Sequence, residues 1–409
     1  MKHPDSDALL HIFQAALLAV NGQHAVAERL RRLPLQGELR MVAVGKAAQS
    51  MAQGAHEVLN GQVTRGLVIS KNGHIDFPNC ARLGWEAIEG GHPLPNRGSL
   101  LAGERLLEFL TQDVSTPLLF LISGGASSLL ECPVEGVNEA FLVRVNGWLL
   151  GSGLAIDEMN RVRKGLSRIK GGGLLQWLRE RPVHALAISD VPGDDPGVIG
   201  SGLLVPDSTL AAGLLQLGLP TWLKTPIEHG LQARHEMPGK APRVEIVANL
   251  DLAKRAAAAK ATELGYPVRL VDRFIQGDAA EAGRQMAESL LDGGAGVTVW
   301  GGETTVRLPR TPGRGGRNQH LALAAAQVLA GREGVWFLSA GTDGTDGPTE
   351  DAGALVDGGT ASRAITEGFD INETLGAADS GHLLEASGDL ITSGPTGTNV
   401  MDLMIGLKL

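Results

Sequence analysis

The polar residues best suited to chemistry lie directly after an apolar run, residues 335–338, which is typical of a strand buried on both faces. The segment that follows, residues 339–347, alternates three glycines with threonine and aspartate. Glycine lets backbone approach a ligand closely, and open α/β sheets bind ligands at the carboxyl ends of their strands. Asp343 and Asp346 could therefore hold a hard cation or polarise a hydroxyl. A plain turn and one copy of a calcium-binding Gly-Asp repeat are the alternatives.

Other glycine-bearing loops that follow predicted strands carry a cation, hydroxyls or a carboxylate. Lys46 precedes a predicted helix, where a phosphate is favoured, although a solvated lysine is the local alternative. Residues 123–128 combine small residues, hydroxyls and backbone N–H groups, as anion-binding turns do, and they lack the Gly-x-Ser-x-Gly pattern of a serine hydrolase. Asp190 directly follows a buried strand, a common position for a metal ligand or a general base.

The arginine- and glycine-rich segment 307–318 runs into a predicted helix over residues 319–329. Arg317 therefore lies at a helix start, where its guanidinium and unpaired backbone N–H groups would together bind a phosphoryl group. The alternative is a flexible loop. The last such loop offers hydrogen-bonding side chains at Thr396, Thr398 and Asn399.

Cations for phosphates, carboxylates for Mg²⁺ and hydroxyl activation, and many backbone donors are the components of phosphoryl transfer. The sequence lacks a Gly-x-Gly-x-x-Gly fingerprint after a strand with a distal acid, so a nicotinamide enzyme is poorly supported. Because the loops come from both halves of the chain, we expect an active-site cleft between two domains.

Buried apolar runs that alternate with helical patterns predict an α/β fold of two Rossmann-like three-layer α/β/α domains. A region rich in proline and glycine places the boundary near 238, which gives domains 1–238 and 239–409. We expect an N-terminal helix over 7–31, a basic helix that ends at glycines 171–173, and a second βαβ series that begins with the strand 244–248. The predicted strands are residues 41–44, 66–70, 117–122, 185–188, 244–248, 268–271, 297–300, 335–338 and, as the last strand, 389–392.

The composition limits the classes of protein to which the chain can belong. With 409 residues, 43% hydrophobic and 20% charged, it is typical of a soluble globular protein of two or three domains. A net charge of -9 without a basic stripe argues against nucleic-acid binding. No apolar run approaches membrane-spanning length, and the N-terminus lacks the features of a signal peptide. Cys80 and Cys132 have no metal-ligand spacing, so we expect a reduced, cytoplasmic protein, and a homodimer is left open.

Six sequence motifs follow one another along nearly the whole chain. They are LISGGASSLL (121–130), NRVRKGLSRIKGG (160–172), ISDVPGDDPGVIGSG (188–202), GGETTV with GRGGRNQ (301–306 and 313–319), AGTDGTDGPTEDAGALVD (340–357) and GPTGTNVMDL (394–403). In these motifs and in their order, the chain resembles the MOFRL-type glycerate 2-kinases, a family often labelled hydroxypyruvate reductase in tartrate-degradation clusters.

The resemblance implies ATP-dependent phosphorylation of D-glycerate to 2-phosphoglycerate with a divalent cation, in two α/β domains around a deep cleft. It implies that Lys46 and Arg317 are active-site cations and that Asp190 is the aspartate of the family's Ile-Ser-Asp word. We further expect Asp190, with Asp343, to hold Mg²⁺, and Asp190 or Asp194 to orient the C2 hydroxyl of glycerate. The residues expected to bind substrate or phosphate are Ser123, Gly124, Gly125, Ser127, Asp194, Asn318, Thr342, Thr396 and Asn399.

Two departures from the family pattern bear on the substrate rather than on the reaction. Gly165 stands where a histidine is usual, which could remove a polar side chain from the cleft. Gly202 and Leu203 stand where Gly-Pro is usual, which could loosen a turn. The competing functions are an NAD(P)H-dependent hydroxypyruvate reductase, a kinase for another small hydroxy acid, and a non-catalytic sugar-acid sensor.

Overall fold

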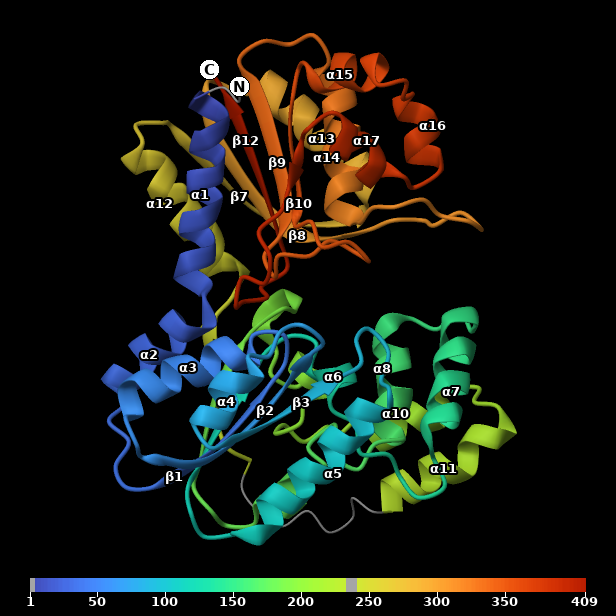
Figure 1. The fold of residues 1–409 in the computed structure, drawn as a ribbon. Coiled ribbons are helices and arrows are strands. Elements are labelled where there is room, and N and C mark those ends of the chain that lie inside the picture. The colour runs from blue at the N-terminus through green and yellow to red at the C-terminus, as the bar shows by residue number, and fades with distance from the viewer. Residues whose placement is uncertain (1–3, 233–240) are drawn as a thin grey trace. The chain divides into compact units, whose positions relative to one another are not determined.

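A computed structural model describes residues 4–232 and 241–409 (Figure 1). The chain divides into two compact units. Gly22–Val247 forms the N-terminal unit, and the chain up to Asn21 together with Ala248–Leu409 forms the C-terminal unit. The predicted domain boundary at residues 238–239 lies outside the described residues.

The N-terminal unit is built on a six-stranded sheet in the order β3-β2-β1-β4-β5-β6. The pairs from β3 through β5 are all parallel. This is the order of the doubly wound dinucleotide-binding fold, and it reverses between β1 and β4. Every residue of the two central strands is buried, because helices cover both faces of such a sheet. The strands are β1 (Leu39–Val44), β2 (Val63–Lys71), β3 (Trp85–Gly90), β4 (Leu118–Ile122), β5 (Val183–Ile188) and β6 (Val244–Ala248).

Helices surround this sheet and form a second apolar core beside it. The larger core unites the strands with helices such as α5 through Phe120, Ile122 and Leu106. A separate cluster of α7, α8, α10 and α11 packs around Val145 and Val162. The helices are α2 (Gly22–Arg32), α3 (Ala48–Leu59), α4 (Phe77–Arg82), α5 (Arg97–Gln112), α6 (Ala126–Leu129), α7 (Glu139–Gly151), α8 (Ile156–Gly165), α9 (Leu175–Leu178), α10 (Leu210–Gln216) and α11 (Thr221–Gln232).

The C-terminal unit contains a mixed sheet in the order β11-β10-β9-β12-β8-β7. Only β7 and β8 pair in parallel, and the other pairs are antiparallel. The helices α1 and α12 pack together on one side of this sheet, and α13 and α14 lie on the other (Figure 1). The strands are β7 (Val268–Asp278), β8 (Gly296–Thr305), β9 (Val335–Gly341), β10 (Gly353–Asp357), β11 (Leu390–Ile391) and β12 (Asp402–Lys408). The helices are α1 (Pro4–Val20), α12 (Leu250–Glu263), α13 (Ala279–Asp292), α14 (Arg317–Leu329), α15 (Thr360–Thr366), α16 (Ile371–Gly376) and α17 (Ser380–Ala386).

The predicted α/β class with two sheet-based units is confirmed, but several elements differ from the sequence prediction. The helix expected over 7–31 is two helices, α1 and α2, which break at Asn21 and belong to different units. The basic helix ends at Gly165 rather than at glycines 171–173, since the chain then turns, with positive φ at Gly171 and Gly172.

Three predictions about strands are wrong, because the sheet that a strand joins and the length of the strand depend on tertiary contacts. β6 was expected to open the second series, but it joins the first sheet, where Val244 and Ile246 pack against that unit's core. Residues 301–305 continue strand β8 instead of forming a loop. The strand at 389–392 is not the last one, because β12 follows it and inserts, almost fully buried, between β9 and β8.

Candidate active site

Two loops meet where the strand order of the N-terminal sheet reverses. Gly45 follows β1 with a φ of +123°, and a side chain there would collide with Ser123 after β4. The Ser123 hydroxyl accepts a hydrogen bond from the N–H of Ala47 at 3.0 Å, and the Lys46 N–H donates to the Gly124 carbonyl at 2.9 Å. Ser123 is fully buried, so its side chain positions the lysine loop rather than facing a ligand. Lys46 therefore lies at the switch point, where doubly wound sheets bind ligands.

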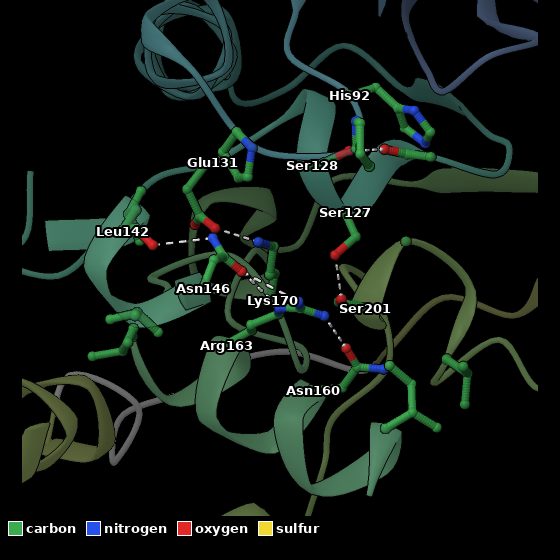
Figure 2. A pocket seen from close by; sticks show the side chains of 18 of the residues that line it. His92, Ser127, Ser128, Glu131, Leu142, Asn146, Asn160, Arg163, Lys170 and Ser201 are labelled. Atoms are coloured by element: carbon green, nitrogen blue, oxygen red, sulfur yellow. Dashed lines mark hydrogen bonds and ion pairs between the residues drawn. The ribbon is translucent and has the colours of Figure 1, made fainter. Parts of the chain in front are cut away.

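A cavity of about 420 Å³ opens beside this switch point (Figure 2). Three predicted site residues line it, Gly125, Ser127 and Asp190. Lys46 lies next to it, because a Cβ on Gly125 would come 3.2 Å from the Lys46 Cγ. Asp194 does not line the cavity and sits in the turn after β5 with a φ of +55°. Four of the predicted residues are thus brought together in one unit.

The wall of the cavity contains a buried ion pair between Glu131 and Lys170. The two side chains are only 4% and 2% exposed. Glu131 also accepts hydrogen bonds from the Ser167 hydroxyl at 2.6 Å and the Cys132 N–H at 3.0 Å. The sequence reading missed Glu131, although a single acid inside an apolar stretch was a usable signal, because buried charges are usually paired.

A second cation in the wall is Arg163 of α8, which the sequence indicates only as part of a basic helix. Its Nε and Nη2 donate to the Asn146 Oδ1 at 3.3 and 3.2 Å, and its Nη1 donates to the Asn160 Oδ1 at 3.0 Å (Figure 2). Asn146 is itself held by the Leu142 carbonyl at 3.0 Å. Burial lowers the pKa of Arg163, because the charged form loses hydration there.

In the C-terminal unit, Arg317 is the first residue of α14, as predicted. Its Nε and Nη2 donate to the Asp402 carboxylate at 2.6 and 3.1 Å, and its Nη1 lies 2.6 Å from Glu303. Burial works against the charge on Arg317, but Asp402 and then Glu303 outweigh it, and the pKa is raised. The sequence did not reveal Asp402, because 85 residues separate it from Arg317.

The start of α14 is occupied by Asp346. Its carboxylate accepts hydrogen bonds from the N–H groups of Asn318 at 3.0 Å and Gln319 at 2.8 Å. The expectation that these N–H groups are open to a phosphate is therefore wrong, because a carboxylate from another loop caps the helix. Burial raises the pKa of Asp346 to about 7, although both N–H donors favour its charged form.

The remaining predicted residues of this unit stabilise one another's loops. The Thr342 hydroxyl donates to the Met401 carbonyl at 2.6 Å, and the Thr396 hydroxyl donates to the Thr342 carbonyl at 2.5 Å. Asp343 accepts from the N–H and hydroxyl of Thr345 at 3.0 and 3.1 Å. Both Asn318 and Asn399 are buried, and the Asn318 Oδ1 accepts from the Ser339 hydroxyl at 2.7 Å. The contacts join the loop after β9 to the loop before β12.

The described residues contain no group of three or more His, Cys, Asp or Glu side chains that could hold a metal ion. This arrangement still suits Mg²⁺, which is usually held by one or two carboxylates together with substrate phosphates. Asp190 lines the cavity, and the other carboxylate there, Glu131, is already paired with Lys170. The joint use of Asp190 and Asp343 stays a prediction, because they belong to different units.

The structure also locates the two departures from the family pattern. A Cβ on Gly165 would lie 2.9 Å from the Leu214 Cδ1 and next to Ile227, so this position faces the apolar helix cluster rather than the cavity. Gly202 adopts a φ of +67°, and its N–H donates to the Ile199 carbonyl at 3.0 Å. Leu203 is buried. Gly165 thus affects helix packing rather than the polar lining of the cavity.

The chain is thus a two-unit α/β protein with cations and carboxylates in the loops at the ends of its strands. Residues 8–224 match the model of a domain of unknown function, DUF4147, and residues 296–402 match the MOFRL family. The chain is 39% identical to a D-glycerate 2-kinase of Thermotoga maritima over 97% of both chains. It is 34% identical to a glycerate 2-kinase of Pyrococcus horikoshii, covering 92% of this chain and 89% of the relative.

A solved structure gives the same result. The crystal structure of a glycerate kinase from Thermotoga maritima superposes with a TM-score of 0.85 at 38% identity and covers 99% of both chains. The chain belongs to the MOFRL glycerate kinase family. Among the residues described here, no helix is both long and apolar enough to cross a membrane.

Proposed function

We propose that this protein is an ATP-dependent D-glycerate 2-kinase that produces 2-phosphoglycerate and ADP. The observation that carries the proposal is 39% identity over 97% of both chains with a protein named D-glycerate 2-kinase. The placement of Lys46 after β1 and of Asp190 after β5, the two strands that flank β4 in a doubly wound sheet, supports it. Phosphoryl transfer needs positioning and charge neutralisation more than covalent chemistry, and these residues can supply both.

In the N-terminal unit, Asp190 accepts the hydrogen bond of the C2 hydroxyl and takes its proton. The hydroxyl oxygen forms a bond to the γ-phosphorus of ATP, the bond from that phosphorus to the β–γ bridging oxygen breaks, and ADP leaves with the electron pair. Lys46 neutralises the transferring phosphoryl group, and the turn from Ser123 to Ser127 contributes backbone N–H groups to an anion. Asp194 lies in the turn after Asp190, where its N–H donates to the Val191 carbonyl at 3.2 Å.

In the C-terminal unit, Arg317 is the second cation of the reaction. Its guanidinium is held by Asp402 and Glu303, and a phosphate would share or replace these carboxylate contacts. Hydrogen bonds of Asn318, Thr342 and Thr396 hold the loops of this unit, and Asn399 is buried. Asp190 and Asp343 are the carboxylates that would hold Mg²⁺, which would add positive charge near the transferring phosphate.

The test combines an ADP-release assay using Mg-ATP and D-glycerate with separate identification of the product. Enolase alone converts 2-phosphoglycerate, whereas 3-phosphoglycerate first requires phosphoglycerate mutase. We expect a signal with enolase alone. A signal only after mutase would overturn the assignment of the 2-hydroxyl, and oxidation of NADH with hydroxypyruvate in place of ADP release would support a reductase.

A further inference from the structure

The cavity of the N-terminal unit contains a cation that the proposed chemistry has not used, Arg163. It lines the same cavity as Ser127 (Figure 2). Asp190 lines this cavity as well. The three hydrogen bonds of Arg163 go to the amide oxygens of Asn146 and Asn160, at 3.0 to 3.3 Å. Amide oxygens orient a guanidinium without cancelling its charge.

Among the side chains that the structure describes, no carboxylate lies within ion-pair distance of Arg163. The adjacent Lys164, in contrast, pairs with Asp207 at 3.0 Å. Glu131 lines the same cavity but pairs with Lys170. Arg163 is half-buried and keeps its full charge in the cavity. Such a guanidinium is suited to an anionic ligand, because an opposite charge offsets the free-energy cost of its lost hydration.

The geometry of the guanidinium indicates which anion it would take. A guanidinium has five N–H groups, and three of those of Arg163 donate to Asn146 and Asn160. The two that remain are one on each terminal nitrogen, and a guanidinium commonly offers two N–H groups to the two oxygens of a carboxylate. Asn146 and Asn160 come from α7 and α8, so two helices fix the orientation of the pair before a ligand arrives.

We propose that Arg163 binds the carboxylate of the hydroxy-acid substrate. This inference rests on the proposed kinase function. The hydroxyls of Ser127 and Ser201, 2.7 Å apart, and the carboxylate of Asp190 line the same cavity and suit the hydroxyl groups of such a substrate. Arg163 thus separates recognition of the acid from neutralisation of the phosphate, which belongs to Lys46 and Arg317.

The first test compares Arg163→Gln and Arg163→Lys with the unaltered enzyme in steady-state kinetics. For Arg163→Gln we expect the KM for D-glycerate to rise on the order of 10²-fold, because an unpaired carboxylate then binds next to an amide. The KM for ATP should change less than about threefold, and Arg163→Lys should fall between the two. Arg161→Gln, on the same helix but outside the cavity lining, is the matched control and should leave both KM values unchanged.

The second test keeps Arg163 and compensates its charge. Asn160→Asp replaces the neutral acceptor 3.0 Å from Nη1 with a carboxylate of nearly the same shape. We expect the KM for D-glycerate to rise about tenfold or more while the melting temperature is maintained. This variant remains informative if Arg163→Gln does not fold.

Two results would overturn the assignment. One is a normal KM for D-glycerate in folded Arg163→Gln. The other is a rise in the KM for ATP instead, which would assign Arg163 to a phosphate. A thermal-shift titration with D-glycerate and no nucleotide separates this failure from failure of the kinase proposal. If the unaltered protein binds D-glycerate but releases no ADP, the kinase proposal fails, and loss of that binding in Arg163→Gln still tests the carboxylate site.

Discussion

Arg163 and Arg317 are both partly buried arginines on helices, yet neutral groups hold the first and negatively charged groups hold the second. Arg163 is held by two amide oxygens, whereas Arg317 is held by the carboxylates of Asp402 and Glu303, with Asp346 also close enough to affect it. The pKa of Arg163 is lowered by burial, and the pKa of Arg317 is raised because carboxylates outweigh burial.

The difference shows two ways to keep a buried guanidinium ready for an anion. Neutral acceptors leave the whole charge for the ligand, so the free protein bears the cost of an uncompensated cation. Carboxylates stabilise the free protein, so a phosphate must compete with them. We therefore expect changes at Arg163 to alter ground-state binding of the substrate, and changes at Arg317 to alter turnover and stability.

The largest effect is expected at Arg317. Arg317→Ala should lower kcat on the order of 10³-fold or more, because a cation that neutralises the transferring phosphoryl group is lost. Arg317→Lys should recover part of the turnover, since it keeps the charge without the two-pronged contact to Asp402. Arg310→Ala, at an exposed position of the same loop, is the control and should be normal.

These kcat values are to be measured where circular dichroism shows a folded protein, because Arg317→Ala leaves Asp402 buried and unpaired. Normal turnover in folded Arg317→Ala would show that Arg317 does not neutralise the transferring phosphoryl group. Arg163 and Arg317 would then not differ in function as proposed.

A smaller effect, on stability, is expected at Glu131. Glu131→Ala should lower the free energy of unfolding by about 3–5 kcal/mol, because Lys170 remains buried without its partner. Urea unfolding measures this change, and the exposed Glu135→Ala should stay within about 0.5 kcal/mol of the unaltered protein.

Glu131 also bears on the charge around Arg163, because it is a carboxylate in the wall of the same cavity. Glu131→Gln leaves the charge of Lys170 unpaired in the cavity wall, so we expect the KM for D-glycerate to rise no more than about threefold. A change as large as that of Arg163→Gln would show that Glu131 controls the charge of the cavity.

A pH effect is expected near Arg317. Because burial raises the pKa of Asp346 to about 7 in the folded protein, its protonation favours folding. This contribution is fully present below about pH 4 and is lost as the pH rises through about 7. Relative to Asp346→Asn, the unaltered protein should lose about 2–3 kcal/mol of stability between about pH 5 and pH 8.

Thermal unfolding of both proteins across this range measures the difference. Asp292→Asn, at an exposed position of α13, should show no such trend. A stability difference between unaltered protein and Asp346→Asn that does not vary with pH would mean that the cap of α14 stays charged throughout.

The smallest effect is expected at Gly165, on the helix of Arg163. Gly165→Ala should cost about 1 kcal/mol, because its Cβ would press on Leu214 at 2.9 Å. The KM for D-glycerate should not change, since the position faces the apolar cluster. Gly147→Ala on α7, where a Cβ meets nothing within 4 Å, should be neutral or slightly stabilising, and melting curves distinguish the two. A raised KM in Gly165→Ala would place the position back at the cavity.

Much of the fold followed from the sequence because its local signals were strong. The apolar runs before Lys46, Ser123 and Asp190 formed strands β1, β4 and β5, which are neighbours in the sheet. β12 was missed and β6 was assigned to the wrong sheet, because an apolar strand carries no mark of the sheet it will join.

Sequence patterns were enough to place Lys46 and Asp190 after buried strands and Arg317 at a helix start. The charges around these residues emerge only when the chain has folded. Asp402 reaches Arg317 across 85 residues, Asp346 fills a helix start expected to be open, and Asn146 reaches Arg163 from another helix. Local backbone preference acts over a few residues, whereas charge compensation depends on distances through space and on burial, which only the folded chain sets.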